Sequence, residues 1–233
     1  MTDQIPNQLY FQDDAYTLVA VSNLYLFTPR MFGIEPCMVN TACWRGYVAY
    51  FLLQGRRLVV KHLEFCTLDD EVPIINEVHA QDIHKVGWFD YRYINLDYEL
   101  DYTGGLLIAN DYIGCTGLYG VNPAIEHRTV YELLFHRGSL IAFHDRSEVV
   151  ETIRKEVKGL DRVEAIRSAD KHFLRIYGFQ GFGEWYWCTA MQFREKRATK
   201  ESIALEKTMR AARADYDEWL AAVKERRKLD KCA

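Results

Sequence analysis

The chain lacks the segments that would carry it into or across a membrane. Residues 1–4 (MTDQ) contain no basic region of the kind that opens a signal peptide. The longest nearly apolar run, Leu18 to Phe27, is interrupted by Ser22 and Asn23. It is about half as long as the ~20 residues that a spanning helix needs. We therefore expect a cytoplasmic protein with no membrane partner.

Recognisable metal-binding patterns are also missing. The six cysteines form no Cys-x-x-Cys pair and follow no regular spacing, and the seven histidines form no His-x-x-x-His pair. In a chain without an export signal, cysteines are normally reduced. Structural zinc sites, in contrast, usually show closely spaced ligand pairs. We expect free thiols, no bound metal and no cofactor.

Aromatic residues are plentiful and charge is unevenly divided. Aromatic residues make up 14% of the chain, with tyrosine the commonest, which favours β-structure. Residues 1–145 hold 9 Lys and Arg against 18 Asp and Glu (net −9), and residues 146–233 hold 20 against 15 (net +5). This asymmetry indicates either a nucleic-acid-binding tail or two parts that attract each other. We favour the second interpretation, because +5 is modest and acidic residues are interspersed.

Two segments have the pattern of β-hairpins. In residues 41–65 the strands surround Gln54-Gly55, and in residues 129–144 they surround Arg137-Gly138. Both follow the scheme of apolar run, x-Gly, polar residue and apolar run. The scheme indicates either an internal duplication or two hairpins with the same turn chemistry.

The remaining pattern predicts further strands and then helices. We expect one or two strands in residues 16–27, loops in 66–95, and one strand over 96–110 with a bulge or bend at Gly104-Gly105. A helix is expected over 147–157, with Ser147 as its N-cap and Gly159 at its end. A short helical stretch is expected over 162–170 and a long amphipathic helix over 200–228.

These elements predict an α+β fold. An antiparallel β-sheet domain built from hairpins (1–145) would be followed by a helical C-terminal segment (146–233) packed on it. In the long amphipathic helix, the apolar stripe consists of Met209, Ala212, Tyr216, Trp219, Leu220 and Val223. Leaving such a stripe in water is costly, so we expect the helix to dock on its own β-domain in a monomer.

Short motifs resemble a family of small uncharacterised bacterial β-rich proteins. They are Trp44-Arg45-Gly46-Tyr47 before a tight turn, the strand 103–108 (TGGLLI), which matches a Thr-Gly-x-Leu-x-Ile pattern loosely, and Tyr131-Glu132. The resemblance covers roughly residues 15–145, and the helical segment after residue 147 departs from it. It implies a bacterial origin and a β-rich organisation, and it implies no activity.

A polar face on the first hairpin is one candidate binding site. If Gln54-Gly55 forms the turn, Arg45 lies opposite Glu64 and Tyr47 lies opposite His62. These four side chains would line a pocket for an anionic or amide ligand. The alternative, an exposed cross-strand ion pair with no ligand, is favoured.

The second hairpin and the cysteines offer weaker candidates. Counted in the same way, Tyr131 lies opposite His144, with Glu132 and His136 on the other face. A Glu–His–His metal site there would need a third ligand, and His127 is the nearest in sequence. A Cys–His nucleophile at Cys43 or Cys115 is disfavoured, because Cys43 within a strand is more often a small buried apolar residue.

A glycine-rich segment, residues 178–183 (GFQGFG), precedes Trp185 and Trp187. The lysine of a phosphate-binding loop is missing, so the segment is not expected to hold a nucleotide. The two tryptophans are candidates for stacking on a base or a peptide. The favoured alternative is that the aromatic residues pack the helical segment onto the sheet.

Three functions follow from these patterns. We favour a non-enzymatic interaction protein, an immunity, adaptor or defence-associated component that binds a protein partner. The second hypothesis is a hydrolase or nuclease that uses Arg45, Glu64 and a histidine. The third is nucleic-acid binding through the basic end of the C-terminal helix, residues 224–228 (KERRK).

Overall fold

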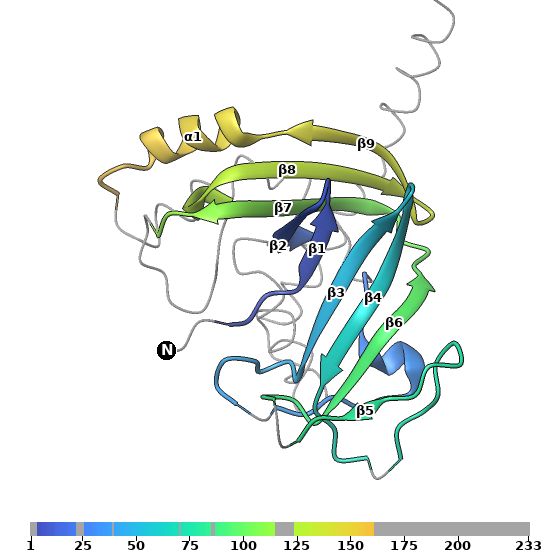
Figure 1. The fold of residues 1–233 in the computed structure, drawn as a ribbon. Coiled ribbons are helices and arrows are strands. Elements are labelled where there is room, and N and C mark those ends of the chain that lie inside the picture. The colour runs from blue at the N-terminus through green and yellow to red at the C-terminus, as the bar shows by residue number, and fades with distance from the viewer. Residues whose placement is uncertain are drawn as a thin grey trace, which may run out of the picture.

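The computed structural model describes residues 4–21, 26–38, 40–69, 71–84, 87–114 and 124–160. Within these ranges the chain is mostly one large β-sheet with a single α-helix (Figure 1). The strands are β1 (Gln8–Phe11), β2 (Asp14–Val21), β3 (Tyr47–Gln54), β4 (Arg57–Phe65), β5 (Gln81–Asp82), β6 (Tyr91–Glu99), β7 (Gly104–Tyr112), β8 (His127–His136) and β9 (Ser139–Asp145). The helices are the 3₁₀ turns η1 (Pro29–Phe32) and η2 (Ala124–Glu126), and α1 (Ser147–Glu156).

The sheet is mixed, and it closes on itself. Its order is β3-β1-β2-β7-β8-β9-β4-β6-β5, and β3 also pairs with β4. Seven strands, β3-β1-β2-β7-β8-β9-β4, therefore form a ring, which a bridge between Arg57 and Ser139 closes. The expectation of a purely antiparallel sheet is wrong, because β1 runs parallel to β3. This pairing joins segments that are distant in sequence, so no hairpin pattern could reveal it.

The main core fills the inside of the ring. Inward-facing side chains alternate along the strands with outward-facing ones, as the two-residue period of a strand requires. On β7, Leu106 and Ile108 point into this core, whereas Leu107 and Ala109 point outward. Tyrosine and phenylalanine supply much of the filling, since Tyr93, Tyr102, Phe51, Phe65 and Phe135 are its largest fully buried side chains. Within the described residues, part of the aromatic excess of the sequence is thus used to fill the core.

α1 covers the outer face of β7 and β8. Val150 and Ile153 are buried against Leu107 and Val130. Burial of each of these side chains stabilises the fold by about 1.5–3 kcal/mol. The helix begins at Ser147, as expected, but Arg146 is the N-cap. The Ser147 hydroxyl instead accepts a hydrogen bond from the Val130 N–H at 3.1 Å, so it ties the helix to β8.

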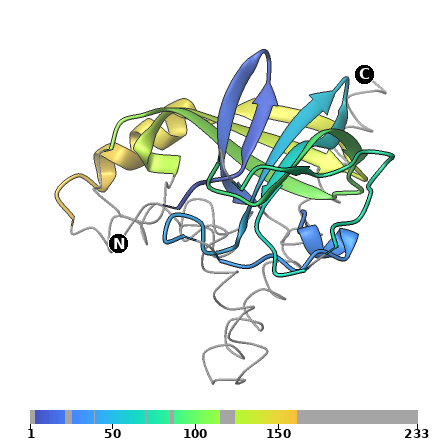
Figure 2. The same ribbon diagram turned by 60° about the horizontal axis from the view of Figure 1, so that its bottom comes forward.

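The expected strand over 96–110 is two strands. β6 ends at Glu99 and β7 begins at Gly104. In the link between them, the Tyr102 carbonyl accepts a hydrogen bond from the Gly138 N–H at 2.7 Å. The sequence predicts loops over residues 66–95. In the described part of residues 66–90 this is confirmed apart from the two-residue β5, but residues 91–95 belong to β6, so the expectation is wrong there. These loops and the loop before β3 lie at the end of the molecule away from α1 (Figures 1 and 2).

The helical stretch expected over 162–170, the long helix expected over 200–228, Cys115, Trp185 and Trp187 lie outside the described residues. The division into a 1–145 domain and a docked 146–233 segment therefore stays a prediction.

Candidate functional site

The register of the first hairpin differs from the expected one. Gln54 pairs with Arg57, so Gly55 and Arg56 form the turn, and Gly55 has a positive φ of 64°. A glycine in the first loop position suits a type II′ turn, whereas the count from Gln54-Gly55 assumed glycine in the second. A bulge between Tyr50 and Phe51 shifts the register once more. The predicted pairs Arg45–Glu64 and Tyr47–His62 are therefore wrong.

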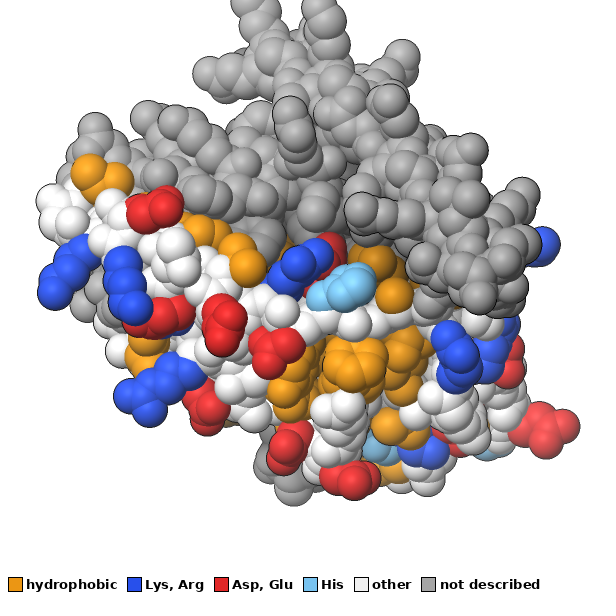
Figure 3. Space-filling model, turned by 90° about the horizontal axis from the view of Figure 1, so that it is seen from above, with side chains coloured by type: hydrophobic (Ala, Val, Ile, Leu, Met, Phe, Trp, Pro, Cys, Tyr) orange, Lys and Arg blue, Asp and Glu red, His pale blue; other side chains and the backbone are white. Residues whose placement is uncertain are grey.

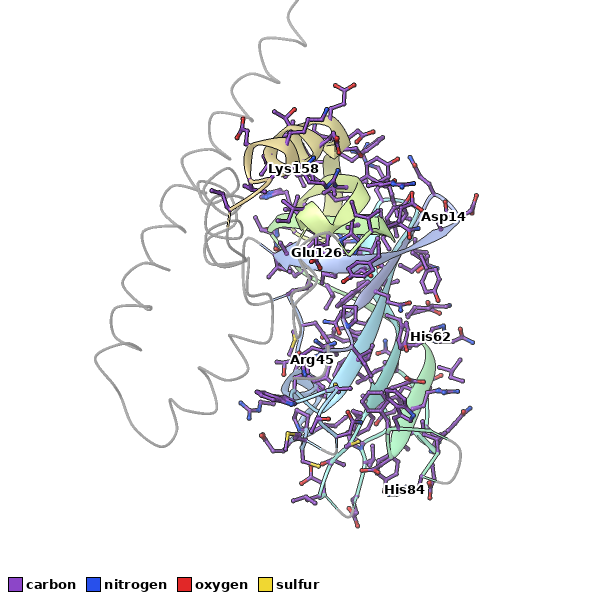
Figure 4. All side chains as sticks on the ribbon, turned by 90° about the vertical axis from the view of Figure 1, so that its left-hand side faces the viewer. Asp14, Arg45, His62, His84, Glu126 and Lys158 are labelled. Atoms are coloured by element: carbon purple, nitrogen blue, oxygen red, sulfur yellow. The ribbon has the colours of Figure 1, made fainter. Side chains whose placement is uncertain are left out.

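Arg45 lies before β3 and acts as a structural clamp. Its guanidinium donates to the Tyr47 carbonyl at 2.6 Å, the Ile5 carbonyl at 2.8 Å and Asn7 Oδ1 at 2.9 Å. Asn7 Oδ1 also accepts from the Ala49 N–H at 2.9 Å. Arg45 is only 8% exposed. Its hydrogen bonds to Ile5 and Asn7 fasten the N-terminal segment to β3. Arg45 and His62 lie well apart (Figure 4).

Tyr47 belongs to the core rather than to a binding face. Its ring packs at 6.2 Å from the ring of Phe27, and its hydroxyl donates to the Phe27 carbonyl at 3.2 Å. It shares with Arg45 a contact in which the guanidinium lies over the ring, 5.3 Å from its centroid. The structure thus brings neither Arg45 nor Tyr47 to His62 and Glu64.

His62 and Glu64 do lie together, with two residues that the expected site did not include. Tyr50 pairs with His62 across β3 and β4, and Arg92 pairs with Glu64 across β4 and β6. We call Tyr50, His62, Glu64 and Arg92 the polar face. Counting from the true turn, with its bulge, would have found Tyr50. Finding Arg92 from the sequence would have required the pairing of β4 with β6, which no turn specifies.

Glu64 is the centre of the polar face, and its oxygens are engaged. One oxygen accepts from Arg92 Nε at 2.7 Å, and the other accepts from the Tyr50 hydroxyl at 3.2 Å. Burial and the Glu64 carboxylate raise the pKa of Tyr50 to about 12. Because both oxygens already accept hydrogen bonds, this carboxylate is poorly placed to accept a proton from a substrate.

The surroundings of His62 favour the neutral form of its ring. Burial lowers its pKa below the ordinary value, and the neighbouring Lys61 lowers it further. Nδ1 accepts a hydrogen bond from the Asn95 N–H at 3.2 Å, so the ring proton is on Nε2. The polar face can therefore donate hydrogen bonds from His62 and Arg92, but its one carboxylate is already used.

The second hairpin has the expected turn and a shifted far end. His136 pairs with Ser139, as predicted, and Arg137 and Gly138 both have positive φ, as a type I′ turn requires. A bulge between Leu134 and Phe135 then places Glu132, rather than Tyr131, opposite His144. The two hairpins therefore use different turns, and their shared x-Gly scheme does not reflect one turn chemistry.

The buried Glu132 is paired with an arginine. Arg146 Nε donates to a Glu132 oxygen at 2.7 Å, and a second guanidinium nitrogen contacts the same oxygen. Within the described ranges, no group of three or more His, Cys, Asp and Glu side chains is arranged to hold a metal ion.

The cysteines that the structure describes are free thiols packed in one cluster. Cys43 and Cys66 are buried with Val48, and Cys37 packs against them. Cys43 Sγ donates to the Tyr47 carbonyl at 3.2 Å. Burial raises the pKa of the Cys66 thiol to about 12, which leaves almost no thiolate at pH 7. Cys43 is thus a small buried residue, as the favoured interpretation expected.

Three apolar side chains are exposed on the loops beside this cluster. Leu68 is 87% exposed, Trp88 65% and Met38 57%. They come from three loop segments that lie close together at the same end of the molecule (Figure 2). We call Met38, Leu68 and Trp88 the apolar loop end. The sequence signal that could have found Leu68 is an apolar residue directly before the acidic run 69–71.

The three segments are fastened to one another close to each exposed side chain. The Cys37 N–H donates to the Cys66 carbonyl at 2.9 Å, next to Met38. The Thr67 hydroxyl, next to Leu68, donates to the Glu35 carbonyl at 2.8 Å. Cys66 Sγ contacts the carbonyl oxygen of Trp88 itself at 3.8 Å. The exposed side chains therefore project from loops whose backbone these contacts fix in place.

A second apolar patch consists of aromatic side chains that pack mostly against one another. Four rings, those of Phe11, Tyr16, Tyr131 and Phe143, pack within 5.5–6.4 Å of their neighbours in edge-on or tilted contacts. Phe11 and Tyr16 are buried and Phe143 is half-exposed. Figure 3, which looks down on this side, shows a hydrophobic patch with acidic side chains beside it. These rings extend the main core to the surface.

Comparison with known proteins finds no matching family model, no matching curated protein and no matching solved structure. The resemblance to small bacterial β-rich proteins therefore stays a prediction from the motifs. No helix in the described part of the chain is long and apolar enough to cross a membrane.

Proposed function

We propose that this chain is a non-enzymatic protein-binding domain and that the apolar loop end is its binding surface. The observation that carries the proposal is the exposure of Leu68, Trp88 and Met38 on loops that are fixed to one another. Tryptophan and methionine are enriched at protein interfaces, and buried tryptophan anchors supply much of the binding energy there. Roles in immunity, as an adaptor or in defence are all consistent with such a surface.

The fixed backbone is what makes the surface suitable for binding. A partner that covers Trp88 and Leu68 removes apolar area from water, which favours association. Loops that are ordered before binding lose little further conformational entropy. Isolated exposed apolar side chains are ordinary on protein surfaces. Three exposed apolar side chains on neighbouring loops with a fixed backbone are typical of a surface that is ordered before a partner binds.

The polar face gives less support to the hydrolase or nuclease hypothesis. Its carboxylate is engaged by Arg92 and Tyr50, and Arg45, which that hypothesis required, is a clamp elsewhere. The nucleic-acid hypothesis rests on residues 224–228, which lie outside the described ranges.

The test is differential capture by the immobilised chain from extracts of its source cell, followed by direct binding of the purified captured protein. We expect the double variant Leu68→Asp, Trp88→Asp to lose the partner, with an affinity at least about tenfold weaker. The matched control is Val149→Asp, which adds a charge at an exposed position near the start of α1. A partner that binds both variants as well as the unmodified chain would show that the interface lies elsewhere.

A further inference from the structure

A second surface lies where the turn between β1 and β2 approaches the end of β9. We call its four rings, those of Phe11, Tyr16, Tyr131 and Phe143, the aromatic patch. Phe143 is 48% exposed, and Tyr131 is half-buried. The ring of Phe143 packs edge-on against the rings of Phe11 and Tyr131, at 5.5 and 6.4 Å, and these contacts hold it in place. The patch therefore presents ordered aromatic surface to the solvent.

Strand register places two carboxylates on the same face as the aromatic patch. Asp14 pairs with Phe11 across the β1–β2 hairpin, and Asp145 pairs with Tyr131 across β8 and β9. Side chains of directly opposite residues share one face of a sheet. Asp145 also follows Phe143 by two residues, which is the spacing that returns a strand to the same face. Both aspartates therefore border the patch.

A third carboxylate reaches the same rings. Asp111 Oδ2 accepts a hydrogen bond from the Thr129 hydroxyl at 3.0 Å, and Thr129 lies two residues before Tyr131 on β8. Burial raises the pKa of Tyr16, and the neighbouring Tyr131, Asp14 and Asp111 raise it further. A phenol whose ionisation is opposed by two carboxylates lies within reach of their charge. The acids thus act on the patch itself.

The protein does not neutralise this charge by ion pairing. Asp14, Asp111 and Asp145 are exposed, and in the part of the chain that the structure describes none of them pairs with a lysine, arginine or histidine. Asp145 Oδ1 accepts from the Ser147 N–H at 2.8 Å, which leaves the negative charge in place. The patch therefore combines aromatic rings with carboxylates that lack a counter-charge.

This combination decides the chemistry of the ligand. A cation is attracted both to the face of an aromatic ring and to a carboxylate. Arginine suits the surface better than lysine, because its planar guanidinium stacks on a ring and pairs with carboxylates through a fork of N–H donors. The guanidinium is also more weakly hydrated than an ammonium group, so it loses less on contact with the rings. Phosphates of nucleic acids would be repelled by the carboxylates.

We propose that the aromatic patch binds an arginine side chain of a protein partner. The guanidinium lies against the rings of Phe143 and Tyr131, and the three carboxylates attract it. The site goes beyond the proposed function and lies elsewhere on the molecule. Asp145 comes directly before α1, whereas the apolar loop end lies at the end away from α1 (Figure 1). Salt weakens the interaction, because exposed charges are screened within about 10 Å at 0.1 M ionic strength.

The test is an NMR titration of the full chain with the N-acetyl amides of arginine, lysine and citrulline. Citrulline has nearly the shape of arginine and carries no charge. We expect the arginine compound to shift the ring resonances of Phe143 and Tyr131 and to bind more tightly than the lysine compound. Its binding should weaken as salt rises, and the citrulline compound should leave the resonances unshifted.

Variants of the patch and of a distant surface localise the binding. Asp14→Asn, Asp145→Asn removes two charges and keeps the oxygen that accepts from the Ser147 N–H. It is expected to weaken binding of the arginine compound at least about threefold, and so is Phe143→Leu, which removes a ring. The matched control is Glu71→Gln, Glu77→Gln, which removes the same charge from exposed positions on the loops after β4 and is expected to leave binding unchanged.

The proposal is overturned if the arginine compound causes no shifts, or if the citrulline or the lysine compound binds equally well. It is also overturned if the control on the loops weakens binding as much as the variants of the patch. The double variant Leu68→Asp, Trp88→Asp is expected to bind the arginine compound like the unmodified chain. Failure of the aromatic patch and failure of the proposed function are therefore observed separately.

Discussion

Gly138 lies directly against the backbone of Leu100. A Cβ atom on Gly138 would be 1.9 Å from the Leu100 carbonyl oxygen. The Gly138 N–H donates to the Tyr102 carbonyl, and its own carbonyl accepts from the Leu58 N–H at 2.9 Å. The turn between β8 and β9 is therefore fastened to β4 and to the link between β6 and β7. This is the place where the ring of strands closes.

Gly138→Ala is expected to destabilise the protein far more than Gly55→Ala. Both glycines have positive φ, which costs an alanine about 1–2 kcal/mol. Gly55 has open space around the position of a Cβ atom, whereas Gly138 has none. We expect Gly138→Ala to lose at least about 2 kcal/mol more free energy of unfolding in urea denaturation. Equal losses would mean that the ring closes without this close approach.

Arg45→Ala is expected to lower the free energy of unfolding by about 2–4 kcal/mol, because it leaves buried hydrogen-bond acceptors unsatisfied. Lys61→Ala, which removes a partly exposed ion pair with Asp97, is expected to cost less than about 1 kcal/mol. Chemical denaturation measures both. Amide hydrogen exchange should also quicken around Ile5 and Asn7 in the Arg45 variant. An Arg45 variant as stable as the parent would contradict its role as a clamp.

The Tyr50 hydroxyl is expected to titrate near pH 12, and Glu64→Gln is expected to lower that pKa, because the carboxylate no longer disfavours the phenolate. Tyr93, whose pKa burial raises to about 12, is the internal control and should not change. In the unfolded chain a tyrosine titrates near pH 10. The stabilising contribution of both residues is therefore complete below about pH 10 and is lost between about pH 10 and 12. Ultraviolet difference titration follows the phenolates.

The pKa values of His84 and His62 are expected to lie on opposite sides of the ordinary histidine value. The hydrogen bond from His84 to Asp82 raises the pKa of His84, and burial lowers that of His62. The contribution of His84 to stability is thus present at low pH and is lost as pH rises through its raised pKa. Asp82→Asn should lower the pKa of His84 and leave that of His62 unchanged in an NMR titration. A shift of both would mean that the substitution alters the loops as a whole.

The sequence predicted the local elements of the fold better than their pairing. Apolar alternation and x-Gly turns indicated both hairpins, and the charge pattern of residues 147–157 indicated α1. The register of the first hairpin failed, because glycine suits either position of a two-residue turn, depending on turn type. The bulges at Tyr50 and Leu134 then shifted the far ends of both hairpins. A bulge depends on packing across strands, which local sequence does not show.

The candidate sites show the same limit. His62 and Glu64 were placed on one face correctly, because alternate residues of a strand share a face. Their neighbours Tyr50 and Arg92 depend on a bulge and on a third strand. Leu68 and Trp88 are twenty residues apart in sequence. Their loops approach each other because Phe65 at the end of β4 pairs with Tyr91 at the start of β6, and because Cys66 Sγ contacts the Trp88 carbonyl oxygen.

The closure of the ring at Arg57 and Ser139 also bears on how the chain folds. β2 pairs with β7, and β1 pairs with β3, across long stretches of intervening chain. Each such pairing must overcome the entropy of closing a long loop before its contacts form. Proteins dominated by distant contacts fold slowly, on a timescale of milliseconds to seconds.

The two hairpins can form early, whereas the packing of Gly138 against Leu100 requires both of them and is expected to come late. Gly138→Ala should therefore speed unfolding much more than it slows refolding.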